Sequence, residues 1–191
     1  MFLPLLFIVV NYISARYKLI PSIEREGENT YGTVYYAISL SILTFISYIL
    51  QMWMFAFIGI LVMAYGDGFA GLVGNKYGAR KIPFAKGKSL EGSSMVFIFT
   101  FIITLIIPLY YSGNLDLPFN FFLIIALANA IYSTLLELSV SDGFDNLLLP
   151  LGSGIFAGLL LYFFSRPQIL LIVLASLIVF FSYKKRAISL D

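Results

Sequence analysis

Three groups of polar residues in this sequence have the types and spacing needed for metal or phosphate chemistry. The first is a single carboxylate, Asp67, which follows a long apolar run and precedes a segment rich in glycine and basic residues. The second is an acidic group in which Glu137 is followed by Asp145 and Asn146. Such carboxylates suit a Mg²⁺ ion that keeps several waters and bridges substrate phosphates. The third group is the basic segment itself, whose cations and backbone N–H groups suit phosphates.

The basic segment covers residues 75–93 and is interrupted by glycines and a proline. Its cations are Lys76, Arg80, Lys81, Lys86 and Lys88. A hydroxyl residue, Ser89, follows the last of them. Basic cytoplasmic loops are common in membrane proteins and also contact anionic lipid, so this loop taken alone favours lipid contact. Its position beside a carboxylate within the membrane strengthens the phosphate-binding interpretation.

Asp67 shares its spacing with three glycines. Gly71, Gly74 and Gly78 follow it at intervals of four, three and four residues, which predicts a common face of a helix. A carboxylate on a glycine face would leave a groove where a ligand or metal approaches the backbone. The alternative for the glycines is helix packing, because Gly74 and Gly78 form a GxxxG pattern. Packing does not explain Asp67, since carboxylates within the membrane are costly and usually face a cavity or a partner.

The composition indicates that lipid is the solvent of this protein. Of its 191 residues 60% are hydrophobic and only 12% are charged, and the mean hydropathy is +0.95. A soluble domain of this size could not hide so much apolar surface. The chain has no Cys and no His. Disulfides, thiolates and imidazole are therefore excluded, and any catalysis must use carboxylates, Lys, Arg, hydroxyls or a bound metal ion.

Seven apolar segments predict seven membrane helices. They cover residues 2–15, 34–50, 51–74, 94–111, 119–138, 147–164 and 169–183. A single helix over residues 34–65 would be roughly 48 Å long, too long for a bilayer core of about 30 Å. A new helix that starts near Gln51 removes this mismatch. It also places Asp67 inside the second of the two helices, about 10 Å before its cytoplasmic end.

The basic residues predict the orientation. With the N-terminus outside and the C-terminus in the cytoplasm, eleven of the 12 Lys and Arg residues fall in cytoplasmic segments and only Arg166 does not. The first helix is expected to be uncleaved, because its charge follows its apolar core. Six helices remain an alternative if it lies only in the interface. The expected fold is an all-α, polytopic helical bundle, a single transmembrane domain over residues 1–191, with residues 63–92 as a nucleotide-binding strip and cytoplasmic loop.

The chain resembles the CTP-dependent polyprenol kinase family, which includes dolichol, phytol and related lipid-alcohol kinases. The main match contains Gly66-Asp67, Ala70, Leu72-Val73-Gly74, Tyr77-Gly78 and Gly87-Lys88-Ser89-Leu90-Glu91-Gly92. A second match contains Glu137, Asp145-Asn146-Leu147 and Pro150-Leu151. A third contains Arg25-Glu26-Gly27-Glu28 and Gly32-Thr33-Val34-Tyr35. Together the matches run in the expected order from about Arg25 to Leu151.

The resemblance implies phosphoryl transfer from CTP to the hydroxyl of an isoprenoid alcohol of the dolichol, polyprenol, geranylgeraniol or phytol class. It also implies that residues 66–92 bind CTP, with Mg²⁺ as the cofactor. In this hypothesis Asp67 binds Mg²⁺ or accepts the alcohol proton, and Glu137 and Asp145 complete the catalytic and metal site. The residues expected to bind the nucleotide are Gly66, Gly71, Gly74, Lys76, Arg80, Lys88, Ser89, Glu91 and Asn146.

Two other functions remain open at this point. A CTP-dependent cytidylyltransferase that makes a CDP-lipid needs similar ingredients, but the Pro-Gly-His-Gly-Gly-type block associated with the phosphatidate enzymes is absent. A non-enzymatic transporter or scaffold fits less well, because its polar residues should reach the membrane midplane. The expected partners are CTP, a long-chain isoprenoid alcohol and the lipid bilayer, and no nucleic acid. The sequence determines neither the alcohol nor the oligomeric state.

Overall fold

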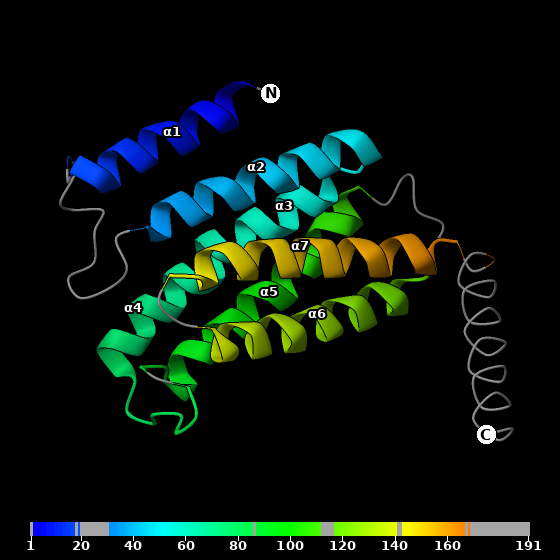
Figure 1. The fold of residues 1–191 in the computed structure, drawn as a ribbon. Helices are drawn as coiled ribbons and strands as arrows, with labels where there is room; N and C mark the ends of the chain where they lie inside the picture. The colour runs from blue at the N-terminus through cyan, green and yellow to red at the C-terminus, as the bar shows by residue number, and fades with distance from the viewer. Residues whose placement is uncertain are drawn as a thin grey trace, which may run out of the picture.

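A computed structural model of the chain shows a bundle of helices that alternate in direction (Figure 1). It describes residues 2–17, 19, 31–85, 87–111, 117–140, 143–166 and 168. The elements are α1 (Phe2–Tyr17), α2 (Gly32–Leu50), α3 (Met54–Leu61), the π-helix η2 (Val62–Asp67), α4 (Gly68–Tyr77), α5 (Leu90–Tyr110), α6 (Phe119–Ser139) and α7 (Asp145–Phe164). These residues contain no strand, which confirms the predicted all-helical class.

Five helices are long and apolar enough to cross a membrane. They are Gly32–Leu50, Met54–Tyr77, Leu90–Tyr110, Phe119–Ser139 and Asp145–Phe164. The helix α1 has 16 residues, fewer than the roughly 20 that a span needs. The seventh predicted span, residues 169–183, lies outside the described residues. The total number of spans and the orientation of the termini therefore stay predictions.

The predicted break near Gln51 is confirmed. Gln51 ends α2 in the left-handed conformation, with φ 53°, and its N–H is bonded to carbonyls of the last turn of α2. The next helix then continues from Met54 to Tyr77 through α3, η2 and α4. Asp67 accordingly lies inside this helix, as the length argument required.

Two of the helix starts that differ from the prediction change the position of site residues. The helix α5 begins at Leu90 rather than Ser94, because the Ser89 hydroxyl caps it by accepting a hydrogen bond from the Gly92 N–H at 3.2 Å. The helix α7 begins at Asp145 rather than Leu147, and a carboxylate in the first turn is favoured by the helix dipole. Glu91, Asp145 and Asn146 therefore belong to rigid first turns, not to free loops.

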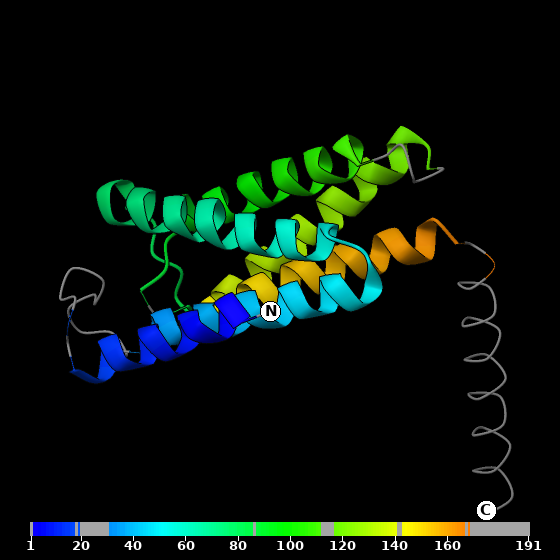
Figure 2. The same ribbon diagram turned by 90° about the horizontal axis from the view of Figure 1, so that it is seen from above.

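The helix α7 is the centre of the bundle. It packs against α2, α3 and α6, whereas α5 lies between α4 and α6, and α1 packs on α2 at the outside (Figures 1 and 2). Backbones meet where α3 crosses α7: a Cβ atom on Gly59 would collide with the Pro150 carbonyl, and one on Gly154 would lie 2.5 Å from the Phe55 carbonyl. Small residues at such crossings are the usual means of close helix packing in membranes.

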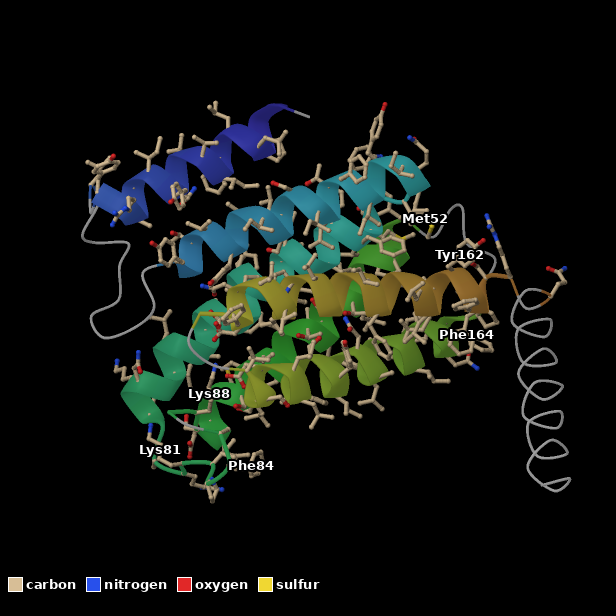
Figure 3. All side chains as sticks on the ribbon, viewed as in Figure 1. Met52, Lys81, Phe84, Lys88, Tyr162 and Phe164 are labelled. Atoms are coloured by element: carbon tan, nitrogen blue, oxygen red, sulfur yellow. The ribbon has the colours of Figure 1, made fainter. Side chains whose placement is uncertain are left out.

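The polar connections gather at one end of the bundle. The end of α1, the start of α2, the end of α4, the start of α5, the end of α6 and the start of α7 all lie on the left in Figure 1. The opposite end carries Met52, Tyr162 and Phe164 (Figure 3). The sequence predicted that these polar loops share one face, and the described ends of the helices have that arrangement.

Candidate functional site

The connection between α4 and α5 folds back on itself. The Leu90 N–H donates to the Arg80 carbonyl at 2.9 Å, and the Ile82 N–H donates to the Lys88 carbonyl at 3.1 Å. An isolated antiparallel bridge pairs Lys81 with Ser89. Gly87 has φ +79°, a conformation that residues with a Cβ atom rarely adopt. The backbone of this loop is therefore fixed, and it delivers Lys88 directly to the start of α5.

The predicted glycine groove is filled by α5. A Cβ atom on Gly74 would lie 3.3 Å from the Ser89 hydroxyl and 3.6 Å from the Gly92 Cα, so these chains are in contact. Gly78 is the residue that ends α4 and also lies against Ser89. Gly74 and Gly78 thus form a packing surface, the alternative that the GxxxG pattern offered. Asp67 ends the π-helix directly before α4, and Gly78 caps α4 with its N–H bonded to the Gly74 carbonyl, so the common face of these four residues stays a prediction.

Lys88 lies among acidic side chains from two other helices. Its Nζ is 2.8 Å from Glu137 Oε1 at the end of α6 and 3.3 Å from Asp145 Oδ2 at the start of α7. The other oxygen of Glu137, Oε2, accepts a hydrogen bond from the Ser93 hydroxyl of α5 at 3.0 Å. Glu137 is only 2% exposed and Ser93 only 3%. Figure 3 shows Lys88 directed into the bundle, whereas Lys81 and Phe84 of the same loop lie at its outer rim.

The surroundings of Lys88 favour its charged form. Burial alone would lower the pKa of the ammonium group, but the carboxylates of Glu137, Asp145 and Asp67 and the hydrogen bond to Glu137 outweigh burial. The pKa of Lys88 is therefore raised above its ordinary value of 10.5. The stabilisation that this contact gives is fully present below that ordinary value and is lost only as the pH rises through the raised pKa.

Asp67 joins this cluster through its charge. It is half-buried, and its carboxylate is close enough to contribute to the raised pKa of Lys88. Asp67 is also the last residue of η2, and single π-turns inside α-helices occur frequently at functional sites. The structure thus brings Asp67, Lys88, Glu137 and Asp145 together from four separate places in the sequence.

Asn146 lies on the far side of Asp145. Its N–H donates to Asp145 Oδ1 at 3.0 Å, and its carbonyl accepts a hydrogen bond from Ser39 of α2 at 3.3 Å. A Cβ atom on Gly32 would lie 2.6 Å from the Asn146 side-chain nitrogen, so the start of α2 touches this residue. The first turns of α2, α5 and α7 therefore converge on the cluster. The positive ends of these three helix dipoles make this end of the bundle favourable for anions.

Other residues predicted to bind the nucleotide lie at the periphery of this cluster. Lys76 is exposed beside the Tyr77 ring, and the exposed Arg80 pairs with Glu91, with 3.7 Å between Arg80 Nε and Glu91 Oε1. Gly66 is buried against Val96 of α5, and Gly71 is half-buried in α4. The Ser89 hydroxyl is buried and caps α5. The roles of these residues toward a nucleotide stay predictions.

Sequence reasoning missed two features of the site. Ser93 was not selected, although its position one helical turn beyond Ser89 gives a weak signal that it faces the same neighbours. The inward direction of Lys88 also had no signal, because five loop cations look alike in a sequence. Several residues considered earlier lie outside the described residues, namely Arg25 to Glu28 and Lys86.

A divalent cation fits two of the three predicted metal ligands. Glu137 Oε1 and Asp145 Oδ2 already share one cationic nitrogen, so one point lies close to both oxygens. Mg²⁺ commonly uses one or two carboxylates and completes its shell with waters and substrate phosphates. A preformed cage of three or more acidic ligands does not occur in the described part of the chain. Glu137 and Asp145 are therefore the residues that would hold the ion, and the role of Asp67 as a third ligand stays a prediction.

Comparisons with known proteins identify relatives that match most of this chain. A phytol kinase of Synechocystis sp. is 38% identical over 146 residues, which cover 76% of this chain and 61% of that protein. A probable chloroplastic phytol kinase of Triticum aestivum is 34% identical over 154 residues, covering 74% of this chain and 49% of the relative. A chloroplastic farnesol kinase of Arabidopsis thaliana is 31% identical over 157 residues, which cover 75% of this chain and 48% of that protein.

The chain spans about half to three fifths of the length of these relatives. No protein-family model and no solved structure matches it. The identities nevertheless extend over most of the chain, and the relatives carry the same type of name, so the resemblance seen in the motifs is confirmed. The chain belongs to the family that contains the phytol and farnesol kinases.

Proposed function

We propose that this protein is a membrane kinase that transfers the γ-phosphoryl group of CTP to the hydroxyl of an isoprenoid alcohol. The phytol and farnesol class is favoured, because the relatives are named for these alcohols. Geranylgeraniol, dolichol and other polyprenols are chemically related acceptors. The reaction takes place at the cytoplasmic face of the membrane, in keeping with the basic residues predicted for that face.

The observation that carries this proposal is the buried contact of Lys88 with Glu137 and Asp145 at the end of an apolar bundle. Phosphoryl transfer needs little covalent chemistry from a protein but much positioning and charge stabilisation. Cations for the phosphates and carboxylates for a metal ion are combined here. A water-soluble nucleotide can reach this end, whereas the apolar helices beside it can hold an alcohol that stays in the lipid.

Each group has a role in the proposed reaction. The alcohol oxygen attacks the γ-phosphorus, the bond from this phosphorus to the β–γ bridging oxygen breaks, and CDP leaves. Asp67 accepts the proton of the attacking hydroxyl. Lys88, together with the exposed Lys76 and Arg80, holds phosphate oxygens. Glu137 and Asp145 would hold Mg²⁺, which would supply positive charge beside those oxygens.

Labelled CTP tests the function. The purified chain is reconstituted in liposomes with phytol, farnesol, geranylgeraniol, dolichol or phosphatidic acid, and supplied with CTP labelled at the γ- or the α-phosphorus. We expect γ-label in the alcohol, and we expect Asp67→Asn to lose nearly all of this transfer. Label from the α-phosphorus in phosphatidic acid would instead identify a cytidylyltransferase. Absence of either label, with no CTP-dependent thermal shift, would favour a transporter or scaffold.

A further inference from the structure

Every carboxylate oxygen of Glu137 and Asp145 already has a partner inside the protein. Lys88 Nζ contacts Glu137 Oε1 at 2.8 Å and Asp145 Oδ2 at 3.3 Å. The Ser93 hydroxyl donates to Glu137 Oε2 at 3.0 Å, and the Asn146 N–H donates to Asp145 Oδ1 at 3.0 Å. Each oxygen keeps a further lone pair, but Lys88 Nζ occupies the position between Glu137 Oε1 and Asp145 Oδ2. A metal ion that bridges these two oxygens therefore has to compete with Lys88 for that position.

Lys88 is the partner whose replacement needs the smallest change. Ser93 is buried in α5, and the Asn146 N–H belongs to the backbone at the start of α7, so both are fixed by helices. The ammonium group is at the end of a long flexible side chain. Its backbone is held separately, by the hydrogen bonds from Lys88 N–H to the Ala85 carbonyl and from Ile82 N–H to the Lys88 carbonyl. The ammonium group can leave while the loop keeps its conformation.

Charge makes the ammonium group and a divalent cation competitors. Glu137 is 2% exposed, and an unpaired carboxylate at that depth would be strongly destabilised. Lys88 supplies the compensating charge in the structure as it stands. A cation placed near the same two oxygens would in turn repel the ammonium group at a few ångströms. The two positive charges therefore exclude each other from one position.

We propose that Lys88 is a resident counter-ion that occupies the metal position of the empty site and moves from the carboxylates to the nucleotide phosphates when a divalent cation binds. This inference rests on the proposed function for the second half of that movement, because the phosphates are those of CTP. The first half, exchange between Lys88 and the cation, depends only on the described side chains. In the absence of substrates, Lys88 neutralises the charges of Glu137 and Asp145.

A permanent ion pair is the alternative, and it predicts that the unchanged chain binds no Mn²⁺ at Glu137 and Asp145, whereas the proposal predicts measurable binding there. The probe is Mn²⁺ alone, with the full chain in detergent and without nucleotide or alcohol, and free Mn²⁺ is counted by electron paramagnetic resonance. We expect Lys88→Gln to bind Mn²⁺ at least about ten-fold more tightly than the unchanged chain, because a competing positive charge has been removed. Equal or weaker binding by a folded Lys88→Gln variant would overturn the proposal.

Matched variants identify the source of the gain. Arg166→Gln removes a cation at the opposite end of the bundle, where Arg166 lies over the Tyr162 ring, and should leave the Mn²⁺ affinity unchanged. Lys88→Arg keeps the charge and should not bind more tightly. Adding Glu137→Gln to Lys88→Gln should abolish the gain, and a gain that survives this second change would contradict the assignment of the site.

A measurement on the unchanged chain covers the case in which Lys88→Gln does not fold. Amine acylation followed by mass spectrometry reports how accessible Lys88 is. Saturating Mn²⁺ should increase the labelling of Lys88 several-fold while the labelling of Lys76, which is already exposed, stays constant. Unchanged labelling of Lys88 at saturating Mn²⁺ would overturn the proposal. Because neither test contains CTP or an alcohol, a failure here is distinct from a failure of the proposed kinase activity.

Discussion

Two polar clusters lie between α5 and α6, and they differ in charge. The first contains Ser93 and Glu137, and Lys88 reaches it from the loop. The second lies deeper in the bundle, where Asn129 donates to the Thr104 hydroxyl at 2.8 Å. Glu137 and Asn129 are eight residues apart on α6, a rise of about 12 Å. Both residues are buried and both face α5, so their surroundings differ mainly in the distance from the end of the bundle.

The difference shows what a buried charge requires. The deeper cluster is neutral and is satisfied by the two helices that carry it, apart from the buried Thr100 hydroxyl, which has no hydrogen-bond partner in the described structure. The cluster with Glu137 needs a cation, and Lys88 of the loop at the end of the bundle supplies it. Neutral hydrogen bonds join the two helices in the deeper cluster, whereas the cluster at the end of the bundle holds charged groups that are candidates for a functional site.

The largest effect is expected when the charge of the outer cluster is removed. Glu137→Gln keeps the size of the side chain and an acceptor for Ser93, but it removes a charge that would hold the metal ion. Transfer of the γ-phosphoryl group should fall by at least about 100-fold, measured with γ-labelled CTP. The thermal unfolding profile checks that the variant is folded. A folded variant with more than half of the normal rate would remove Glu137 from the site.

A smaller loss is expected from Ser93→Ala. Ser93 contacts Glu137 and is a positioning residue, and a hydrogen bond to a charged group contributes about 1.5–3 kcal/mol. The expected result is a roughly ten-fold lower kcat with little change in the KM for the alcohol, since Ser93 contacts no proposed alcohol-binding group. Ser93→Thr retains the hydroxyl and should recover most of the rate. A Thr variant as slow as the Ala variant would show that packing, not the hydrogen bond, matters here.

The smallest effect on activity is expected at the deeper cluster. Asn129→Leu removes the hydrogen bond to Thr104 and should lower the free energy of unfolding by about 0.6–1 kcal/mol, the usual value of such a bond between membrane helices. The rate of phosphoryl transfer should change by less than about two-fold, because no charged group is altered. Denaturation in detergent and the label assay give the two values. A loss of activity as large as that of Glu137→Gln would mean that the two clusters are one functional unit.

Much of the fold follows from simple properties of the sequence. The apolar run after residue 34 is too long for one membrane span, which predicted that α2 and the helix beginning at Met54 are separate. The same argument placed Asp67 inside the second helix. The same reasoning placed Glu137 and Asp145 at one end of the bundle with the basic loop. These features are predictable because bilayer thickness restricts helix length and because charges remain outside the hydrocarbon core.

The contacts inside the site were not predictable to the same degree. Lys81 and Lys88 are equivalent by composition, yet one is exposed and the other pairs with Glu137. Their difference depends on the turn at Gly87 and on backbone pairing between Lys81 and Ser89, which are properties of a three-dimensional loop. The glycine spacing after Asp67 indicated both a groove and a packing surface. Only the position of α5 decides between them.

The π-helix η2 between α3 and α4 restricts the number of residues that this part of the helix can contain. A π-helix closes its hydrogen bonds over five residues instead of four, so η2 holds one residue more than an α-helical path would need. Each residue turns a helix by roughly 100°, so a chain with one residue fewer between Val62 and Asp67 would rotate Asp67 away from Lys88 or rotate α3 away from α7. The extra residue changes the rotation of the helix, so that α3 can pack on α7 while Asp67 faces Lys88. Insertions and deletions should therefore be tolerated less in these six residues than elsewhere in the same helix.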